Sequence, residues 1–144
     1  MNHAIQETNL PDVPLFARGK VRDIYDLGNN LLIVATDRVS AFDVVMPTPI
    51  PGRGIILTQM SLFWFDMMDD IVSNHLVTAD IARYPALLQK YSDQLEGRSM
   101  IVRKAQRIDV ECVVRGYLAG SGWKDYQATG EVCGHALRPG LVES

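Results

Sequence analysis

The sequence has few of the residues that mark secreted, membrane-spanning or zinc-binding proteins. Its only two cysteines, Cys112 and Cys133, are too few and too far apart for a disulfide framework or a zinc set. The three histidines show no ligand spacing. No apolar run approaches the roughly 20 residues of a membrane helix, and no basic-then-apolar signal pattern opens the chain. We therefore expect reduced cysteines, no membrane partner and a cytoplasmic location.

Charge and hydrophobicity narrow the class of protein further. The formal net charge of −3 gives no reason to expect a nucleic-acid partner. Apolar residues make up 47% of the 144 residues, which is typical of a folded domain and too much for a disordered chain. This length suits one domain, or one domain plus part of another. Residues 137–144 read as a loop that no closing strand or helix follows, so we expect a piece of something longer.

The first half of the chain shows strand patterns followed by a helical one. Residues 21–26 and 31–36, joined by a turn at Gly28, predict an antiparallel hairpin, and a short strand is expected at 44–46. Thr58 is a candidate cap for a helix that runs to about residue 72. An apolar stripe at helical spacing on this helix is expected in the core: Met60, Phe63, Trp64, Met67 and Ile71.

The second half alternates between the same two patterns. Pro85 suits the first turn of a short helix that ends near Tyr91, and strands are expected at 98–108 and 110–115. Ser121 is a candidate cap for a helix that ends near Gly130. Strands first, with helices inserted, predict an α+β fold.

A glycine turn is the first group of residues that could carry chemistry. Gly19 lets the backbone approach a phosphate closely, and its amide can donate to it. If Lys20 and Arg22 lie on a strand, they share a face and could reach the same polyphosphate. The alternative is a hairpin edge with solvated charges. The spacing is not that of a Walker A motif.

Two further segments concentrate polar residues. Residues 37–43 hold two carboxylates, an arginine and Ser40, which suits a zwitterionic or polyhydroxylated ligand, or equally a turn that bonds its own backbone. In residues 110–122 an expected strand delivers Arg115, and a turn of small residues leads to Ser121 at a helix start. Helix N-termini bind phosphates, so Arg115 and Ser121 could hold a monophosphate; plain capping by Ser121 is the alternative.

Three strings in this order resemble those of the SAICAR synthetase family. They are residues 19–25 (Gly-Lys-Val-Arg-Asp-Ile-Tyr), 37–43 (Asp-Arg-Val-Ser-Ala-Phe-Asp) and 108–121, the last being the most specific. The resemblance runs from about Leu15 to the end of the chain, and the longer subfamily is the closer match. Asp109 departs from the proline that many members carry, at a position away from the chemistry.

The resemblance implies a fold of two α+β lobes around a nucleotide cleft, similar to protein kinases and ATP-grasp enzymes. Residues 1–107 would be an ATP-binding lobe with an antiparallel sheet and inserted helices, and 108–144 the start of a truncated second lobe. The implied activity is that of a ligase of purine biosynthesis. It joins L-aspartate to the carboxylate of carboxyaminoimidazole ribonucleotide (CAIR) with ATP and Mg²⁺, giving SAICAR, ADP and phosphate through an acyl phosphate.

Roles for individual residues follow from the same resemblance. The residues expected to contact ATP are Gly19, Lys20, Arg22, Arg103, Lys104, Arg107 and Glu111. The residues expected to bind the other substrates are Ser40, Asp43, Arg115 and Ser121. Lys20 and Arg115 are the residues expected to act in catalysis.

Two alternatives belong to other functional classes. One is a kinase-like nucleotide-binding lobe that acts on another acceptor; it would share the glycine turn but would not explain the phosphate site at Arg115 and Ser121. The other is a non-catalytic regulatory module. The family's later strand of the Asp-x-Lys-x-Glu-Phe-Gly type, which supplies metal-binding acids, is absent. Metal ligands are therefore not assigned, and we expect the 144 residues alone to lack activity. The oligomeric state is not assigned either, because members of the family differ.

Overall fold

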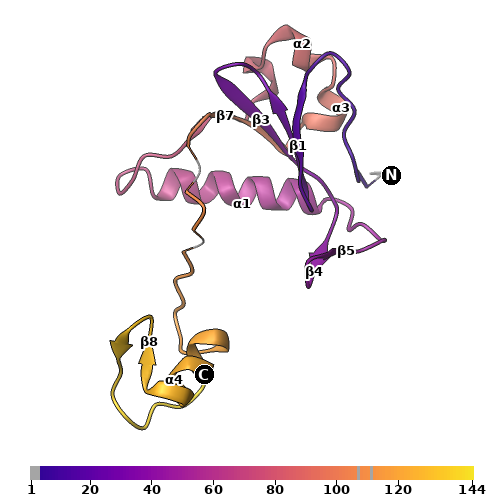
Figure 1. The fold of residues 1–144 in the computed structure, drawn as a ribbon. Helices are drawn as coiled ribbons and strands as arrows, with labels where there is room; N and C mark the ends of the chain where they lie inside the picture. The colour runs from indigo at the N-terminus through magenta and orange to yellow at the C-terminus, as the bar shows by residue number, and fades with distance from the viewer. Residues whose placement is uncertain (1–3, 107, 111) are drawn as a thin grey trace. The chain divides into compact units, whose positions relative to one another are not determined.

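A computed structural model describes residues 4–106, 108–110 and 112–144 of the chain. The chain divides into two compact units, Met1–Gln106 and Arg107–Ser144, and each is described by itself (Figure 1). Within the described residues no helix combines the length and the apolar character that a membrane span needs. Cys112 and Cys133 are both free and exposed.

The first unit is built on one antiparallel sheet, which confirms the predicted α+β class. The sheet order is β1-β2-β3-β7-β6. Its strands are β1 (Leu15–Arg18), β2 (Arg22–Asp26), β3 (Asn30–Ala35), β6 (Leu76–Thr78) and β7 (Ser99–Arg103). The predicted hairpin is confirmed by β2 and β3, which pair from Arg22 opposite Ala35 to Asp26 opposite Leu31. At its turn, Gly28 has φ 79° and donates its N–H to the Asp26 carboxylate at 2.7 Å.

Helices cover the two faces of this sheet (Figure 1). On one face lie η1 (Ile81–Arg83), α2 (Ala86–Gln89) and α3 (Ser92–Leu95), with Pro85 at the start of α2 as the sequence predicts. They enclose the core with the strands and the N-terminal segment. The buried core residues are Leu10, Val13, Tyr25, Leu32, Val34, Tyr84, Leu88, Leu95 and Ile101. On the other face lies α1 (Arg53–Met67), which packs on β3 and β7.

The start of α1 differs from the prediction. Thr58 does not cap the helix but lies buried inside it, because the helix begins five residues earlier, at Arg53. A free N–H of its first turn, that of Gly54, donates to the Asp37 carboxylate at 2.9 Å. The partner lies far away in the sequence, so no local capping pattern reports it.

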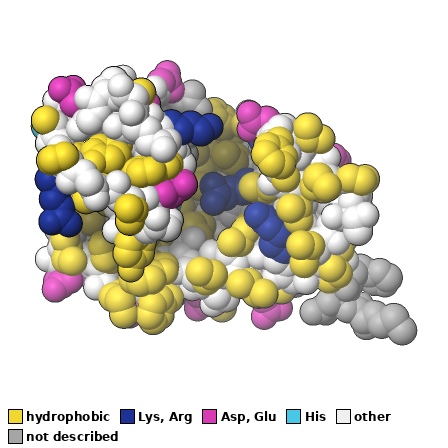
Figure 2. Space-filling view, turned by 90° about the horizontal axis from the view of Figure 1, so that it is seen from below, with side chains coloured by type: hydrophobic (Ala, Val, Ile, Leu, Met, Phe, Trp, Pro, Cys, Tyr) yellow, Lys and Arg dark blue, Asp and Glu magenta, His cyan; other side chains and the backbone are white. Residues whose placement is uncertain are grey.

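The apolar stripe of α1 also differs from the prediction, since its side chains are exposed rather than in the core. Met60, Phe63, Trp64 and Met67 each keep more than half of their surface accessible. Figure 2 shows hydrophobic side chains spread over the side of the chain that is seen from below. The buried residues of α1 are the small ones, Gly54 and Thr58, where the helix approaches the sheet most closely.

A small hairpin lies between β3 and α1. It pairs β4 (Ser40–Ala41) with β5 (Val44–Val45), which confirms the short strand expected at 44–46. Its two-residue loop has positive φ at both positions, 48° at Phe42 and 65° at Asp43. That conformation closes tight hairpins, yet phenylalanine adopts it at a cost in backbone strain.

The strands expected after residue 98 are only partly present. The first is shorter than expected, since β7 ends at Arg103. The strand expected at 110–115 is not formed at residues 112–115, where Val113 and Val114 are exposed. An apolar run makes a stable strand only beside a partner strand, and no strand of the described residues pairs with this segment.

The second unit holds a helix and a short hairpin. The helix α4 (Gly120–Thr129) ends at Gly130 with φ 75°, as predicted. Its cap is Ala119 and not the predicted Ser121, which lies within the first turn. The hairpin joins β8 (Glu131–Val132) to β9 (His135–Ala136).

Candidate functional site

The glycine turn joins β1 to β2 at one end of the sheet. The Gly19 N–H donates to the Arg22 carbonyl at 2.8 Å, which closes the turn. Lys20 lies in the turn itself, so it does not alternate with Arg22 along a strand as expected. Its exposed side chain reaches Asp43, whereas Arg22 lines a cavity of about 130 Å³ beside Thr58 of α1.

Lys20 and Asp43 form an ion pair at 2.6 Å between exposed side chains. The Lys20 ammonium, through its hydrogen bond and its charge, holds the pKa of the Asp43 carboxyl below its usual range. This ion pair places Lys20, which is expected to contact ATP, next to Asp43, which is expected to bind another substrate. Ser40, the other expected substrate residue of this segment, lies half-buried at the start of β4.

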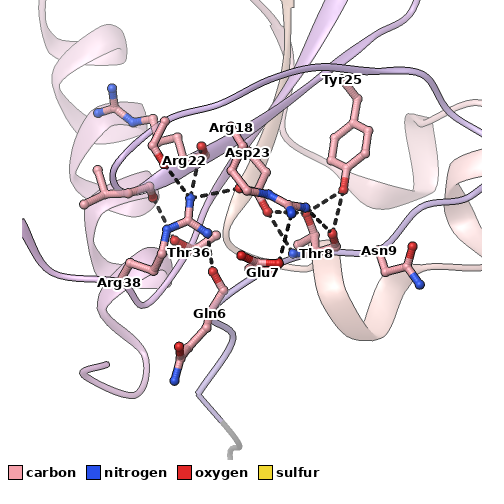
Figure 3. A network of polar contacts seen from close by, with 12 residues as sticks. Gln6, Glu7, Thr8, Asn9, Arg18, Arg22, Asp23, Tyr25, Thr36 and Arg38 are labelled. Carbon is pink, nitrogen blue, oxygen red and sulfur yellow. Dashed lines mark hydrogen bonds and ion pairs between the residues drawn. The ribbon is translucent and has the colours of Figure 1, made fainter. Parts of the chain in front are cut away.

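A buried charge cluster lies directly behind the turn (Figure 3). Asp23 is fully buried, and its Oδ1 accepts from Arg38 at 2.9 Å and from Arg18 at 3.1 Å. Its Oδ2 accepts from the N–H and the hydroxyl of Thr8, each at 2.8 Å. The exposed Glu7 pairs with Arg18 at 2.9 Å, so two arginines face two carboxylates. No pattern in the sequence predicts this cluster, because its members come from separate segments of the chain.

The pKa of Asp23 reflects two opposing effects. Burial alone would raise it, because a charge loses its hydration in the interior. The Thr8 N–H, the Arg38 guanidinium and the Thr8 hydroxyl outweigh burial and lower the pKa below its usual value. Asp23 is therefore an ionised anchor for Arg38.

Arg103 and Lys104 lie at the other end of the sheet from the glycine turn. Lys104 follows β7 and donates to Asp26 at 2.8 Å, which lowers the pKa of that carboxyl. Asp26 is the last residue of β2 and Arg22 the first, so the two ends are roughly 13 Å apart along the strand. The structure does not bring these cations to the turn. The expected ATP contacts Arg107 and Glu111 lie outside the described residues.

In the second unit, Arg115 lies against the first turn of α4. Its guanidinium carbon and both terminal nitrogens are 3.7 Å from the position that a Cβ on Gly120 would occupy. Arg115 and Ser121 line the same cavity, of about 690 Å³, with Tyr117 and Asp125 among the other walls. The two expected phosphate-binding residues are thus brought together at a helix N-terminus, where partial positive charge favours anions.

No group of three or more histidine, cysteine, aspartate or glutamate side chains is placed to hold a metal within the described ranges. The exposed Asp43 is paired with Lys20 and the buried Asp23 and Asp37 with arginines.

Comparison with known proteins decides the family. A family model described as SAICAR synthetase matches residues 15–144. The chain belongs to the SAICAR synthetase family. Among curated proteins named phosphoribosylaminoimidazole-succinocarboxamide synthase, that of Geobacter sulfurreducens is 59% identical over 144 residues. That of Thermodesulfovibrio yellowstonii is 63% identical over the same length.

Solved structures of SAICAR synthetases agree with this assignment. A SAICAR synthase matches 98% of the chain with a TM-score of 0.89 and 48% identity. SAICAR synthase of Saccharomyces cerevisiae, solved in complex with SAICAR, matches 98% with a TM-score of 0.87 and 48% identity. The chain spans about half the length of these relatives: 49% of each of the two bacterial enzymes and 50% of each structure.

Proposed function

We propose that this chain forms half of a SAICAR synthetase. The reaction is the ATP-dependent joining of L-aspartate to the carboxylate of CAIR. Family membership over residues 15–144 supports the reaction class, and the yeast relative bound to SAICAR supports the product. The observation in this structure that supports the proposal is Arg115 folded against the N-terminus of α4, an arrangement that favours an anion.

The chemistry needs charge placement more than a covalent catalyst. A carboxylate is a poor electrophile, so ATP first transfers its γ-phosphoryl group to a CAIR carboxylate oxygen and releases ADP. The aspartate amine then attacks the carbonyl carbon, loses a proton and expels phosphate. The protein aligns the reactants and offsets the phosphate charge.

Each unit contributes one phosphate site to this scheme. In the first, the turn at Gly19 meets the ATP phosphates, with Lys20 and Arg22 as the nearby cations. In the second, Arg115 donates a bidentate pair of hydrogen bonds to the CAIR phosphate. Ser121 and the free N–H groups of α4 donate further hydrogen bonds to it. Mg²⁺ bound to ATP would offset part of the phosphate charge.

We propose that the ion pair between Lys20 and Asp43 breaks when ATP binds. The Lys20 ammonium donates to a carboxylate in this structure, and a phosphate oxygen is an equivalent acceptor with more charge. Transfer of Lys20 to the phosphate frees Asp43 to meet a cation, such as the ammonium group of L-aspartate. Asp43 and Ser40 lie on one small hairpin, which suits a shared substrate contact.

A chimera offers the test in an active context. In it, residues 1–144 replace the matching 144 residues of the Geobacter sulfurreducens enzyme. Arg115→Ala should raise the KM for CAIR about 10- to 100-fold, because a charged hydrogen bond contributes about 1.5–3 kcal/mol. The KM for ATP should stay within about twofold. Steady-state assays with each substrate varied in turn measure both.

Arg138→Ala is the matched control, since Arg138 is an exposed arginine of the same unit that does not line the cavity. It should leave both KM values unchanged. Equal loss of ATP and CAIR affinity in Arg115→Ala, or none, would contradict the assigned phosphate site. A kinase-like lobe acting on another acceptor predicts no such split.

A further inference from the structure

The carbonyl oxygens of the glycine turn are held from behind by one side chain. Arg38 Nη2 donates to the Gly19 carbonyl at 2.8 Å and to the Arg22 carbonyl at 3.2 Å. Its Nε donates to the Lys20 carbonyl at 3.1 Å. Arg38 is only 7% exposed, and these bonds are partly buried (Figure 3). A single planar guanidinium thus fixes three of the four peptide groups of the turn.

The fourth carbonyl is engaged by a neighbour of Arg38. The Val21 carbonyl accepts from the N–H of Thr36 at 3.0 Å and from its hydroxyl at 2.9 Å. Every carbonyl oxygen from Gly19 to Arg22 therefore has a donor from residue 36 or 38. Carbonyl oxygens carry partial negative charge and repel a phosphate, whereas N–H groups attract it.

Arg38 is itself locked in place. Its guanidinium pairs with the fully buried Asp23 at 2.9 Å and also donates to the Gln6 carbonyl. Its charge is balanced by that carboxylate, and each of its three nitrogens donates to a protein acceptor. Arg38 is therefore placed to act on the turn and not on a ligand.

We propose that Arg38 is the positioning residue of the ATP phosphate turn. By holding the carbonyls of residues 19, 20 and 22 inward, it leaves the N–H groups of Lys20 and Val21 and the Lys20 ammonium as the groups that meet the phosphates, while the Gly19 N–H closes the turn. The inference rests on the proposed function and names a residue that acts through the backbone of its ATP site. Lysine cannot replace Arg38, because one ammonium lacks the planar fork that spans three carbonyls and a carboxylate.

Arg38→Lys tests the geometry while keeping the charge beside Asp23. In the chimera it should raise the KM for ATP about tenfold or more, while the KM values for CAIR and aspartate stay within about twofold. In the 144-residue chain, amide hydrogen exchange should become faster at Gly19, whose N–H donates to the Arg22 carbonyl that Arg38 also holds. Exchange at residues 32–34, inside β3, should not change. A purely structural role would raise exchange throughout the unit and would not single out ATP.

Arg98→Lys is the matched control. Arg98 is also a buried arginine, 5% exposed, with Nη1 2.9 Å from the fully buried Asp37, but none of its contacts reaches the turn. It should lower stability and leave the KM for ATP unchanged. A milder second variant, Thr36→Val, removes only the hydroxyl bond to Val21 and should raise the KM for ATP about two- to fivefold.

An unchanged KM for ATP in Arg38→Lys, or an equal change in Arg98→Lys, would overturn the inference. If Arg38→Lys does not fold, Thr36→Val decides: an unchanged KM for ATP and unchanged amide exchange at Gly19 would overturn it too. If the proposed function itself is wrong, the result is different, because the unsubstituted chimera would then form no SAICAR. The exchange measurement on the chain still tests the positioning of the turn in that case.

Discussion

At the scale of single residues, two buried ion pairs hold segments of the first unit together. Asp23 and Asp37 are each fully buried, and each faces an arginine: Arg38 at 2.9 Å and Arg98 at 2.9 Å. Removing one partner of such a pair leaves an uncompensated charge in the interior, which costs several kcal/mol, typically about 3–5. These pairs join segments 15 residues or more apart along the chain, so they hold the turn and the start of α1 in fixed places.

The pH dependence of stability follows from Asp23. Its pKa is lower in the folded than in the unfolded chain, where it is about 3.9. The carboxylate therefore stabilises the fold above that pH, and this contribution disappears as the pH falls through the folded pKa. Urea unfolding from pH 7 to pH 3 should show a plateau above about pH 5 and a decline below it. Asp23→Asn should make the acid decline shallower; an identical slope would contradict the assignment.

Some residues of the candidate site can be named from the sequence and others cannot, for a physical reason. Gly19, Lys20, Arg115 and Ser121 lie in strings with a recognisable spacing, so they could be named in advance. The role of Arg38 could not, because it depends on burial and on carbonyls 16 to 19 residues away. A loop rich in polar residues looks the same in sequence whether its arginine faces water or the interior.

At the scale of elements, strands with a hairpin partner were predictable and the start of α1 was not. The pair β2–β3 follows from two apolar runs and a glycine turn. The start of α1 depends on Asp37, which accepts from the Gly54 N–H at 2.9 Å, and on the lack of a side chain at that glycine. A Cβ there would lie 2.1 Å from the Ala35 carbonyl oxygen of β3.

Gly54→Ala should therefore destabilise the first unit. Relief of the contact requires α1 to move off β3, at a cost of about 1–3 kcal/mol or more. Helix propensity works in the other direction, since alanine favours an α-helix over glycine by about 1 kcal/mol. Urea unfolding followed by circular dichroism measures the sum. Gly116→Ala is the control, because nothing lies within 4 Å of a Cβ there. A more stable Gly54→Ala variant would contradict the close packing.

The outer face of α1 shows that an apolar stripe at helical spacing need not lie in the core. Residues Met60, Phe63, Trp64 and Met67 have the spacing of a core stripe, yet they face outward in this chain. Periodicity reveals that a helix has an apolar face, but not which neighbour covers it. The small residues Gly54 and Thr58 mark the face that lies on the sheet.

At the scale of the whole molecule, the resemblance and the comparisons point the same way. The predicted α+β class, the antiparallel sheet and the family are confirmed. The roles of individual residues and the expectation that these 144 residues alone lack activity stay predictions. Both depend on groups from the half of the relatives' length that this chain does not span.

Turnover by the chimera with the Geobacter sulfurreducens enzyme is the most direct measurement of the central claim. A second chimera, carrying the matching segment of the Thermodesulfovibrio yellowstonii enzyme, controls for joining halves from different organisms. We predict SAICAR formation that depends on ATP, CAIR and aspartate in both chimeras, and none by the 144-residue chain alone. A folded chimera that forms no SAICAR while the control chimera is active would contradict the account.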